Sequence, residues 1–137
     1  NIDYALSLEG SLKLKEISYI HSEAYAAGEL KHGTISLIED GTLVISVASY
    51  EPLIAKTISN AVEVKSRGAE VLSLTTEKSK DLVEHISDNI ITIPDIHEML
   101  LPSLAVVPMQ LFSYYVALMR GCSIDKPRNL AKSVTVE

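Results

Sequence analysis

The 137-residue sequence contains no tryptophan, one phenylalanine and a single cysteine, Cys122. One cysteine excludes an intramolecular disulfide and a cysteine-rich metal site, and it fits a reducing compartment, so we expect a cytoplasmic protein. Basic residues are also scarce, since 12 Lys and Arg stand against 18 Asp and Glu, which gives a formal net charge of -6. Without a basic cluster, nucleic acid is excluded as an expected partner.

Glycine-rich phosphate-binding signatures are missing too, since neither a GxGxxG pattern nor a P-loop occurs in the chain. Their absence argues against an enzyme that binds a nucleotide through such a loop. The sequence begins Asn1-Ile2-Asp3-Tyr4, without an initiator methionine, a basic stretch or the cleavage pattern of a signal peptide. We therefore expect Asn1 to be a cut end within a longer chain.

One charge-free run needs comparison with a membrane span. Residues 99–119 carry no charged side chain, and their number falls within the roughly 17–25 residues that cross a bilayer. Pro102, Pro108 and Gln110 interrupt the run, and no basic cluster flanks it. The composition favours elements buried in a soluble core, so no membrane is expected.

The sequence does have the composition of one globular domain, with 47% hydrophobic and 22% charged residues. Three short apolar runs rich in β-branched residues predict buried strands at 42–48, 70–75 and 90–93. Between the first two runs, apolar residues recur at near-helical spacing over 52–67, and Gly68 suits the end of a helix. A strand, a helix and a second strand make a βαβ unit.

The second half of the chain continues this alternation. Residues 78–85 favour a short helix before the third strand. Because prolines break a long helix, we expect a fourth strand at 104–107 and a separate helix at 109–120. Strands that alternate with helices predict an α/β fold, a three-layer sandwich in which helices flank a parallel sheet.

The last segment differs in character from the rest. Pro127 and the β-branched residues at 133–136 oppose a helix, and the segment is too polar and too short to pack as another layer. We therefore divide the chain into a folded domain at 1–124 and an irregular C-terminal tail at 125–137, which we expect to be ordered or lid-like.

A helix expected at 8–22 carries an unusual arrangement of charges. One face collects polar residues and is predicted to face solvent: Ser7, Ser11, Lys15, Ser18 and Ser22. Glu9, Lys13 and Glu16 gather on roughly the opposite side, where core residues belong. Their spacing allows an internal salt bridge, which is one interpretation. The other is a carboxylate and an ammonium group that line a cavity, where burial tunes both for proton transfer.

Two further candidates lie outside this helix. The stretch 21–33 is dense in ionisable and small residues, and its glycines let His32 present its ring to a cleft or to another subunit. A zinc site in this stretch fails the usual spacing, because neither HxxxH nor HExxH occurs. In the tail, Lys132 can bring an amine to a pocket, and a desolvated lysine forms Schiff bases with carbonyl substrates.

Three stretches resemble a known family: LEGSLKLKEISYIH at 8–21, GELKHG at 28–33 and PRNLAKSVTVE at 127–137. They are similar to the C-terminal isomerase half of the glucosamine-6-phosphate synthases, which are also called glutamine–fructose-6-phosphate aminotransferases. The resemblance covers essentially the whole chain, as the second of two sugar isomerase domains. The tail is the more specific signal, because it separates the synthases from other proteins with this domain.

The resemblance implies roles for individual residues. Lys132 resembles the lysine that forms a Schiff base with open-chain fructose 6-phosphate. Glu16 looks like the base that moves a proton between C1 and C2, and Lys13 resembles the lysine that assists it. His32 is similar to the histidine that opens the sugar ring from the neighbouring subunit. Ala131 corresponds to a tail residue that contacts the sugar through its backbone.

The same resemblance implies the reaction and its partners. The family makes glucosamine 6-phosphate, the first step toward UDP-GlcNAc, from fructose 6-phosphate and ammonia released from glutamine. It implies a homodimer, a sugar phosphate as ligand, a glutaminase domain and a first isomerase domain in the same longer chain, and no cofactor. Where the family commonly has proline, this chain has Thr34, which loosens that loop without removing a reacting group.

Because the phosphate-binding loops and the glutaminase cysteine of the family belong to those other domains, we expect the chain alone to be inactive. Two alternatives remain open at this point. One is a non-catalytic sugar-phosphate-binding module, and the other is an enzyme of the fructosamine-phosphate deglycase type.

Overall fold

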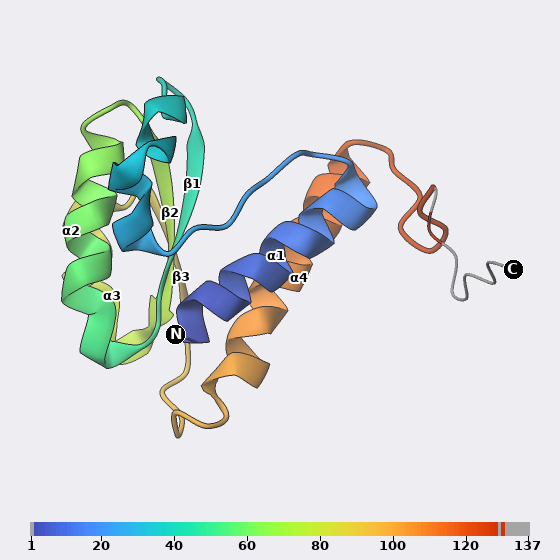
Figure 1. The fold of residues 1–137 in the computed structure, drawn as a ribbon. Helices are drawn as coiled ribbons and strands as arrows, with labels where there is room; N and C mark the ends of the chain where they lie inside the picture. Colours follow the sequence, from blue (N-terminus) through green and yellow to red (C-terminus); the bar gives the residue numbers. More distant parts are fainter. Residues whose placement is uncertain (1, 129, 131–137) are drawn as a thin grey trace, which may run out of the picture.

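A three-stranded parallel sheet forms the centre of the computed structural model, which describes residues 2–128 and 130 (Figure 1). The strands are β1 (Leu43–Ala48), β2 (Glu70–Thr76) and β3 (Asn89–Ile93), and they lie in the order β1-β2-β3. Both pairs of neighbours run parallel. All three predicted strands are thereby confirmed.

The register of the sheet divides its side chains between two cores. Val47 lies beside Leu74, and both belong to the core on one face of the sheet. Val44 lies beside Val71, and both pack on the other face. Because successive side chains of a strand point to opposite faces, apolar runs of this kind leave both faces hydrophobic, and helices must cover each of them.

The two crossover connections cover one face. A short 3-10 helix (Glu51–Leu53) leads into α2 (Ile54–Lys65), which connects β1 to β2. The second connection consists of α3 (Lys80–Val83) between two short 3-10 helices (Glu77–Ser79 and Glu84–Ile86), and it leads from β2 to β3. These are the two helices that the sequence predicts between the strands.

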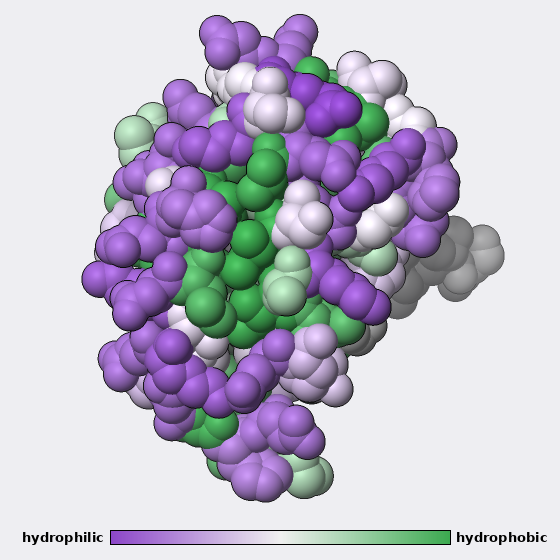
Figure 2. All heavy atoms as spheres, turned by 90° about the vertical axis from the view of Figure 1, so that its left-hand side faces the viewer, coloured by the Kyte–Doolittle hydropathy of each residue, from purple (hydrophilic) through white to green (hydrophobic). Residues whose placement is uncertain are grey.

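Figure 2 shows the side of the molecule on which this layer lies, where hydrophilic side chains surround a central hydrophobic band. The exposed large hydrophobic residues of the layer include Val62 of α2 and Leu82 of α3, which are 44% and 53% exposed. Charged side chains pair nearby, for example Lys65 Nζ with Asp88 Oδ1 at 2.8 Å. The layer thus covers the sheet and presents paired charges to solvent.

Two long helices cover the opposite face. α1 (Ile2–Ser18) and α4 (Leu101–Met119) pack side by side and contact β1 and β3 respectively (Figure 1). Leu6 of α1 and Met109 of α4 share one core with Leu74 of the sheet. With α2 and α3 on the other side of the sheet, the predicted three-layer α/β sandwich is confirmed.

The fourth strand predicted at 104–107 is wrong, because these residues belong to α4. Pro108 lies inside the helix and cannot donate a backbone hydrogen bond to Leu104, which weakens the helix locally. The helix continues because one side of it is packed, and every fourth residue is buried: Leu101, Ala105, Met109, Ser113 and Ala117. Packing of this stripe outweighs the local preferences of proline and valine.

The structure of α4 also bears on whether the charge-free run at 99–119 crosses a membrane. By length and composition α4 could cross a bilayer, and 28% of the stretch is buried inside the fold. Such a helix also occurs in the cores of soluble proteins. The expectation of a core segment holds for the side of α4 that packs on α1 and β3, whereas the exposed side carries Leu111, Tyr115 and Leu118.

α1 begins and ends earlier than the helix predicted at 8–22, and its serine face is packed instead of solvated. Ser11 and Ser18 are 9% and 0% exposed. Small residues on this face let the two long helices approach closely, since a Cβ added to Gly10 would lie 2.3 Å from Met109 Cε and 3.3 Å from Met109 Cβ. The buried Ser18 hydroxyl donates to the Leu14 carbonyl at 2.6 Å, so it needs no water.

We expect Gly10→Val to lower the free energy of unfolding by about 1–3 kcal/mol, the usual cost of overpacking a core. The loss would be steric, because valine is a better helix former than glycine. Ala5→Val, at an exposed position of the same helix, is the matched control and should cost less than about 1 kcal/mol. Urea unfolding measures both variants. Equal stability of Gly10→Val and the unchanged chain would contradict the close packing.

Candidate functional site at the end of α1

Three charged side chains form a cluster on the flank of α1. Lys13 Nζ lies 2.6 Å from Glu16 Oε2 and 3.7 Å from Glu9 Oε1. The Lys13, Glu16 and Glu9 side chains are 32%, 28% and 39% exposed. The predicted salt bridge is confirmed, but the predicted core position of the charges is wrong, because the packed serine face turns them to the half-exposed flank.

The protonation of Lys13 follows from this pairing. The Glu16 carboxylate accepts a hydrogen bond from Lys13 and raises the pKa of its ammonium group above the ordinary value of 10.5. Partial burial opposes the shift, and the charge of Glu9 adds to it. Lys13 is therefore a charged hydrogen-bond donor at neutral pH, suited to orient the Glu16 carboxylate.

The chain leaves α1 through a strained residue. Tyr19 follows the last residue of the helix and has a φ of 61°, the one positive φ among the described residues other than glycine. This conformation costs a bulky residue roughly 1–3 kcal/mol and persists only where the surroundings fix it. The Ser18 hydroxyl contributes by accepting the Ile20 backbone N–H at 3.4 Å.

A cavity of about 390 Å³, open to solvent, lies at this end of α1. Its walls come from the last turn of the helix, the segment after it and the beginning of the tail: Lys15, Glu16, Tyr19, Ile20, His21, Arg128 and Leu130. The Arg128 guanidinium carbon lies 4.1 Å from the centre of the Tyr19 ring. The Tyr19 hydroxyl accepts the backbone N–H of Arg128 at 2.9 Å. This cavity therefore places the Glu16 carboxylate beside the start of the tail.

A larger cavity of about 800 Å³ lies along β1, between the sheet, α1, α2 and α4. Much of its wall is apolar and includes Leu14, Ile45, Val47 and Phe112. His21 lines both cavities, so the two are neighbours along the segment that follows α1. The larger cavity offers mainly apolar contact with a few charged residues, Asp3, Glu23 and Lys56, whereas the smaller one brings Lys15, Glu16 and Arg128 together.

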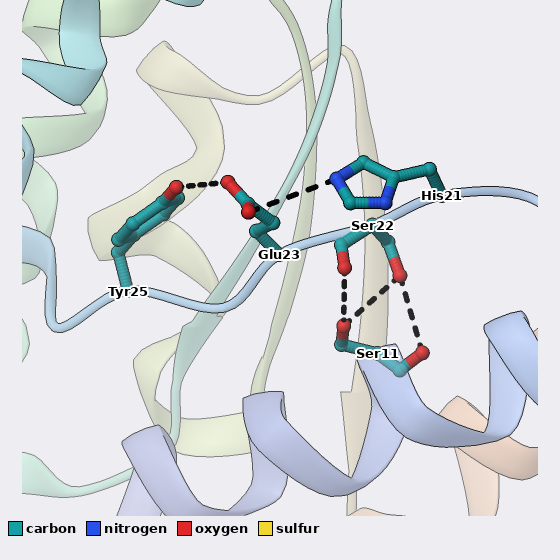
Figure 3. Close-up of polar contacts among 5 residues, drawn as sticks. All are labelled: Ser11, His21, Ser22, Glu23 and Tyr25. Atoms are coloured by element: carbon teal, nitrogen blue, oxygen red, sulfur yellow. Dashed lines mark hydrogen bonds and ion pairs between the residues drawn. The ribbon is translucent and has the colours of Figure 1, made fainter.

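The segment between the two cavities is extended and alternates its side chains (Figure 3). His21 and Tyr25 both turn toward Glu23, whose carboxylate lies 3.7 Å from His21 Nε2 and accepts a hydrogen bond from the Tyr25 hydroxyl. Ser22 turns to the other side, where its carbonyl accepts the Ser11 hydroxyl at 2.9 Å. The hydrogen bond between Ser11 and Ser22 attaches the segment to α1. His21, Glu23 and Tyr25 all line the larger cavity.

The charged end of α1 is suited to proton transfer by a carboxylate. Glu16 borders an open cavity, and the Lys13 ammonium group lies 2.6 Å from its carboxylate. Within the described residues, no group of three or more His, Cys, Asp or Glu side chains could hold a metal ion.

The model of the SIS domain family matches residues 2–120. This chain belongs to the SIS domain family. The match spans α1, the sheet and α4, and it ends before the tail that borders the smaller cavity.

Known proteins extend the comparison beyond the domain. The isomerizing glutamine–fructose-6-phosphate aminotransferases of Clostridium acetobutylicum and Clostridium tetani are 56% and 59% identical to the chain over 136 residues. Each alignment covers 99% of this chain and 22% of the relative, so this SIS domain spans about a fifth of the length of those proteins.

Solved structures show which part of the relatives is matched. The C-terminal domain of glucosamine-fructose-6-phosphate aminotransferase from Francisella tularensis matches with a TM-score of 0.85 and 38% identity, over 90% of this chain and 34% of that one. A glucosamine-6-phosphate deaminase from Thermotoga maritima matches with a TM-score of 0.75 and 32% identity, over 97% and 37% of the two chains. The SIS domain is homologous to the C-terminal part of the aminotransferases.

The structure unites some of the predicted site residues and separates others. Lys13 and Glu16 are in contact, as described above. His32 is exposed at the end of a 3-10 helix (Ala27–His32) that packs on α2, and Figure 1 shows this helix away from the C-terminal end of α1. Within this SIS domain, His32 thus does not share the cavity of Glu16. Lys132 and Ala131 lie outside the described residues.

Tyr19 and Arg128 are site residues that sequence reasoning missed. The periodicity of 8–22 predicted that Tyr19 lies inside a helix, where its ring would not reach the tail. An aromatic residue 109 positions from an arginine gives no local signal of contact. The one available hint was that Arg128 lies four residues before Lys132 in a segment with its own functional prediction.

The contact between Lys13 and Glu16 yields a test by titration. We expect Glu16→Gln to return the Lys13 pKa toward 10.5, because the main cause of its upward shift is removed. Glu9→Gln is the matched control and should change the Lys13 pKa less, since Glu9 lies at 3.7 Å and Glu16 at 2.6 Å. Carbon-detected NMR of the lysine Cε signals measures both.

The sign of the linked stability change follows from the direction of the shift. Because the pKa of Lys13 is higher in the folded state, the stabilisation by the pair is fully present below about pH 10.5 and is lost as pH rises through the folded pKa. Equal Lys13 pKa values in Glu16→Gln and the unchanged chain would contradict the pairing.

Proposed function

We propose that this SIS domain is the catalytic C-terminal isomerase domain of an enzyme that converts fructose 6-phosphate and glutamine to glucosamine 6-phosphate and glutamate. The observation that carries the proposal is the Lys13–Glu16 pair beside a cavity that the tail enters, at 2.6 Å in its closest contact. Identity of 56% and 59% to aminotransferases over 99% of the chain supports the same assignment.

The proposed covalent step uses the tail lysine. The neutral amine of Lys132 attacks the C2 carbonyl of the open-chain ketose, and loss of water leaves a carbon–nitrogen double bond to the lysine. Ammonia then takes the place of the lysine at C2 and releases the free amine. His32, supplied by the neighbouring subunit, opens the sugar ring before Lys132 attacks. Ala131 holds the sugar through its backbone.

The proposed isomerisation uses Glu16. Its carboxylate takes the proton from C1 of the sugar imine and returns it at C2, while the proton of the C1 hydroxyl passes to the nitrogen, which gives the aldehyde carbon at C1 and the amine at C2. The Lys13 ammonium group donates a hydrogen bond to this carboxylate at 2.6 Å. Lys13 assists by holding the carboxylate toward the cavity.

Other parts of the proposed enzyme lie outside this chain. We infer a glutaminase domain that releases ammonia and a first SIS domain that binds the sugar phosphate, both in the same longer protein. We also infer a homodimer in the cytoplasm and no need for a cofactor. Without its companion domains, the SIS domain by itself should form no glucosamine 6-phosphate.

A second candidate function is supported by one comparison. The structure of a glucosamine-6-phosphate deaminase matches 97% of this chain at 32% identity. A deaminase would require no glutamine, so glutamine dependence of the parent enzyme separates the two functions. The higher identity to aminotransferases, 56% and 59%, favours the synthase.

Lys132→Arg in the parent enzyme tests the covalent step. Arginine keeps the positive charge but cannot form the imine, because its guanidinium group stays protonated. We expect synthesis to collapse while part of the glutaminase activity survives. Borohydride reduction with fructose 6-phosphate should add one sugar phosphate to the peptide that contains Lys132. Label on another lysine, or full synthesis by the variant, would refute the assignment.

A mixing experiment tests the placement of His32. Glu16→Gln and His32→Ala should each lower synthesis by about 10²–10⁴-fold, the usual contribution of a positioned acid or base. If His32 serves the neighbouring subunit, mixed dimers of the two variants contain one site with both groups intact. Activity should then reappear on mixing. No recovery after confirmed subunit exchange would place His32 in the site of its own subunit.

A further inference from the structure

Tyr19 connects the end of α1 to the tail through two contacts with the same residue. The Arg128 guanidinium carbon lies 4.1 Å from the ring centre, and the Arg128 backbone N–H donates to the Tyr19 hydroxyl at 2.9 Å. A cation above an aromatic face is an attractive arrangement, and the hydrogen bond fixes the position of the backbone as well. Together they hold both the side chain and the main chain of Arg128.

The backbone of Tyr19 indicates that its side chain matters. Its φ of 61° is a conformation that glycine adopts without steric cost and that a bulky residue adopts rarely. The left-handed turn directly after α1 lets the ring reach the tail and the same cavity that Glu16 borders. A tyrosine at this position provides a ring and a hydroxyl that glycine would not.

We propose that Tyr19 and Arg128 are positioning residues, whose contact anchors the tail at the cavity bordered by Glu16 and so confines Lys132 to the reaction site. This inference rests on the proposed function, in which Lys132 and Glu16 act on one sugar. It adds two residues to which none of the roles above refers.

The length of the chain shows why an anchor at this position matters. Lys132 comes four residues after Arg128, which allows a reach of at most about 14 Å. Nearer to α4, the backbone N–H of Cys122 bonds to the Ala117 carbonyl at 2.9 Å. From Cys122, ten residues before Lys132, the reach is at most about 36 Å. A shorter tether raises the effective concentration of the amine at the cavity.

Variants of the parent enzyme test the anchor from both sides of the contact. Tyr19→Phe keeps the ring and removes the hydroxyl, Tyr19→Leu removes both, and Arg128→Met removes the cation without changing α1. We expect kcat/KM for synthesis to fall roughly 5- to 50-fold in Tyr19→Leu, as the loss of one cation–π contact and one hydrogen bond implies. The value for Tyr19→Phe should lie between those of Tyr19→Leu and the unchanged enzyme.

Two controls separate positioning from folding. The double variant of Tyr19→Leu and Arg128→Met should lose little more than Tyr19→Leu alone, because both changes break one contact. Arg67→Met, at an exposed arginine in the turn after α2, should keep the full rate. Melting temperatures should be unchanged in all variants, while the rate of borohydride trapping on Lys132 falls by the same factor as kcat/KM.

Each outcome bears on a different claim. If Lys132 is trapped equally fast in Tyr19→Leu and in the unchanged enzyme, the anchor is refuted and the proposed function stands. If the unchanged enzyme shows no trapping on Lys132, the proposed function fails and the anchor fails with it. A lower melting temperature in Tyr19→Leu, with full activity of Arg128→Met, would make Tyr19 a structural residue and overturn the proposal.

Discussion

The close approach of α1 to α4 at Gly10 sets the orientation of the candidate site. Met109 fills the space that a side chain at position 10 would take, so the glycine and serine side of α1 must face inward. Once one face of a helix is packed inward, the rotation of the helix about its axis is set. The Glu9, Lys13 and Glu16 cluster consequently lies on a half-exposed flank, where Glu16 borders a cavity.

Both ends of α1 are fastened as well. At its beginning, the Asp3 carboxylate accepts the Ser49 hydroxyl at 2.6 Å and the Tyr50 backbone N–H at 3.2 Å, both just beyond β1. Burial raises the pKa of Asp3, although the hydrogen bonds from Ser49 and Tyr50 oppose this shift. Burying the charged carboxylate therefore costs free energy that these hydrogen bonds offset only in part. At its end, the strained Tyr19 meets Arg128. These contacts restrict the positions that Glu16 can take, which the proposed acid–base role of this residue would require.

The sequence was most informative where local signals and packing agree. β-branched runs predicted all three strands, and apolar spacing up to Gly68 predicted α2, because a buried parallel strand and a crossover helix leave strong one-dimensional patterns. It was misleading for α1, whose apolar residues are spread around the helix: Leu6 is buried, but Leu8 and Leu12 are exposed. The hydrophobic periodicity of α1 then does not show which face is buried, and tertiary contacts such as those of Gly10 and Leu6 with Met109 decide it. The Lys13–Glu16 contact was predictable from i,i+3 spacing, whereas the contact of Tyr19 with Arg128 depends on tertiary structure alone.

Magnitudes distinguish the two interpretations of the Lys13–Glu16 pair. As a salt bridge on a half-exposed helix flank, such a pair stabilises a fold by about 0.2–0.5 kcal/mol, so its loss would change the free energy of unfolding of the domain very little. As a positioned acid–base group, a carboxylate contributes about 10²–10⁴-fold in rate, equivalent to roughly 3–5 kcal/mol. Glutamine in place of Glu16 keeps the size and the hydrogen-bonding oxygen of the side chain but removes its basicity. If Glu16 is catalytic, Glu16→Gln therefore changes the activation free energy about ten times more than the pair contributes to the free energy of unfolding. Which of these two quantities changes decides the role of the pair.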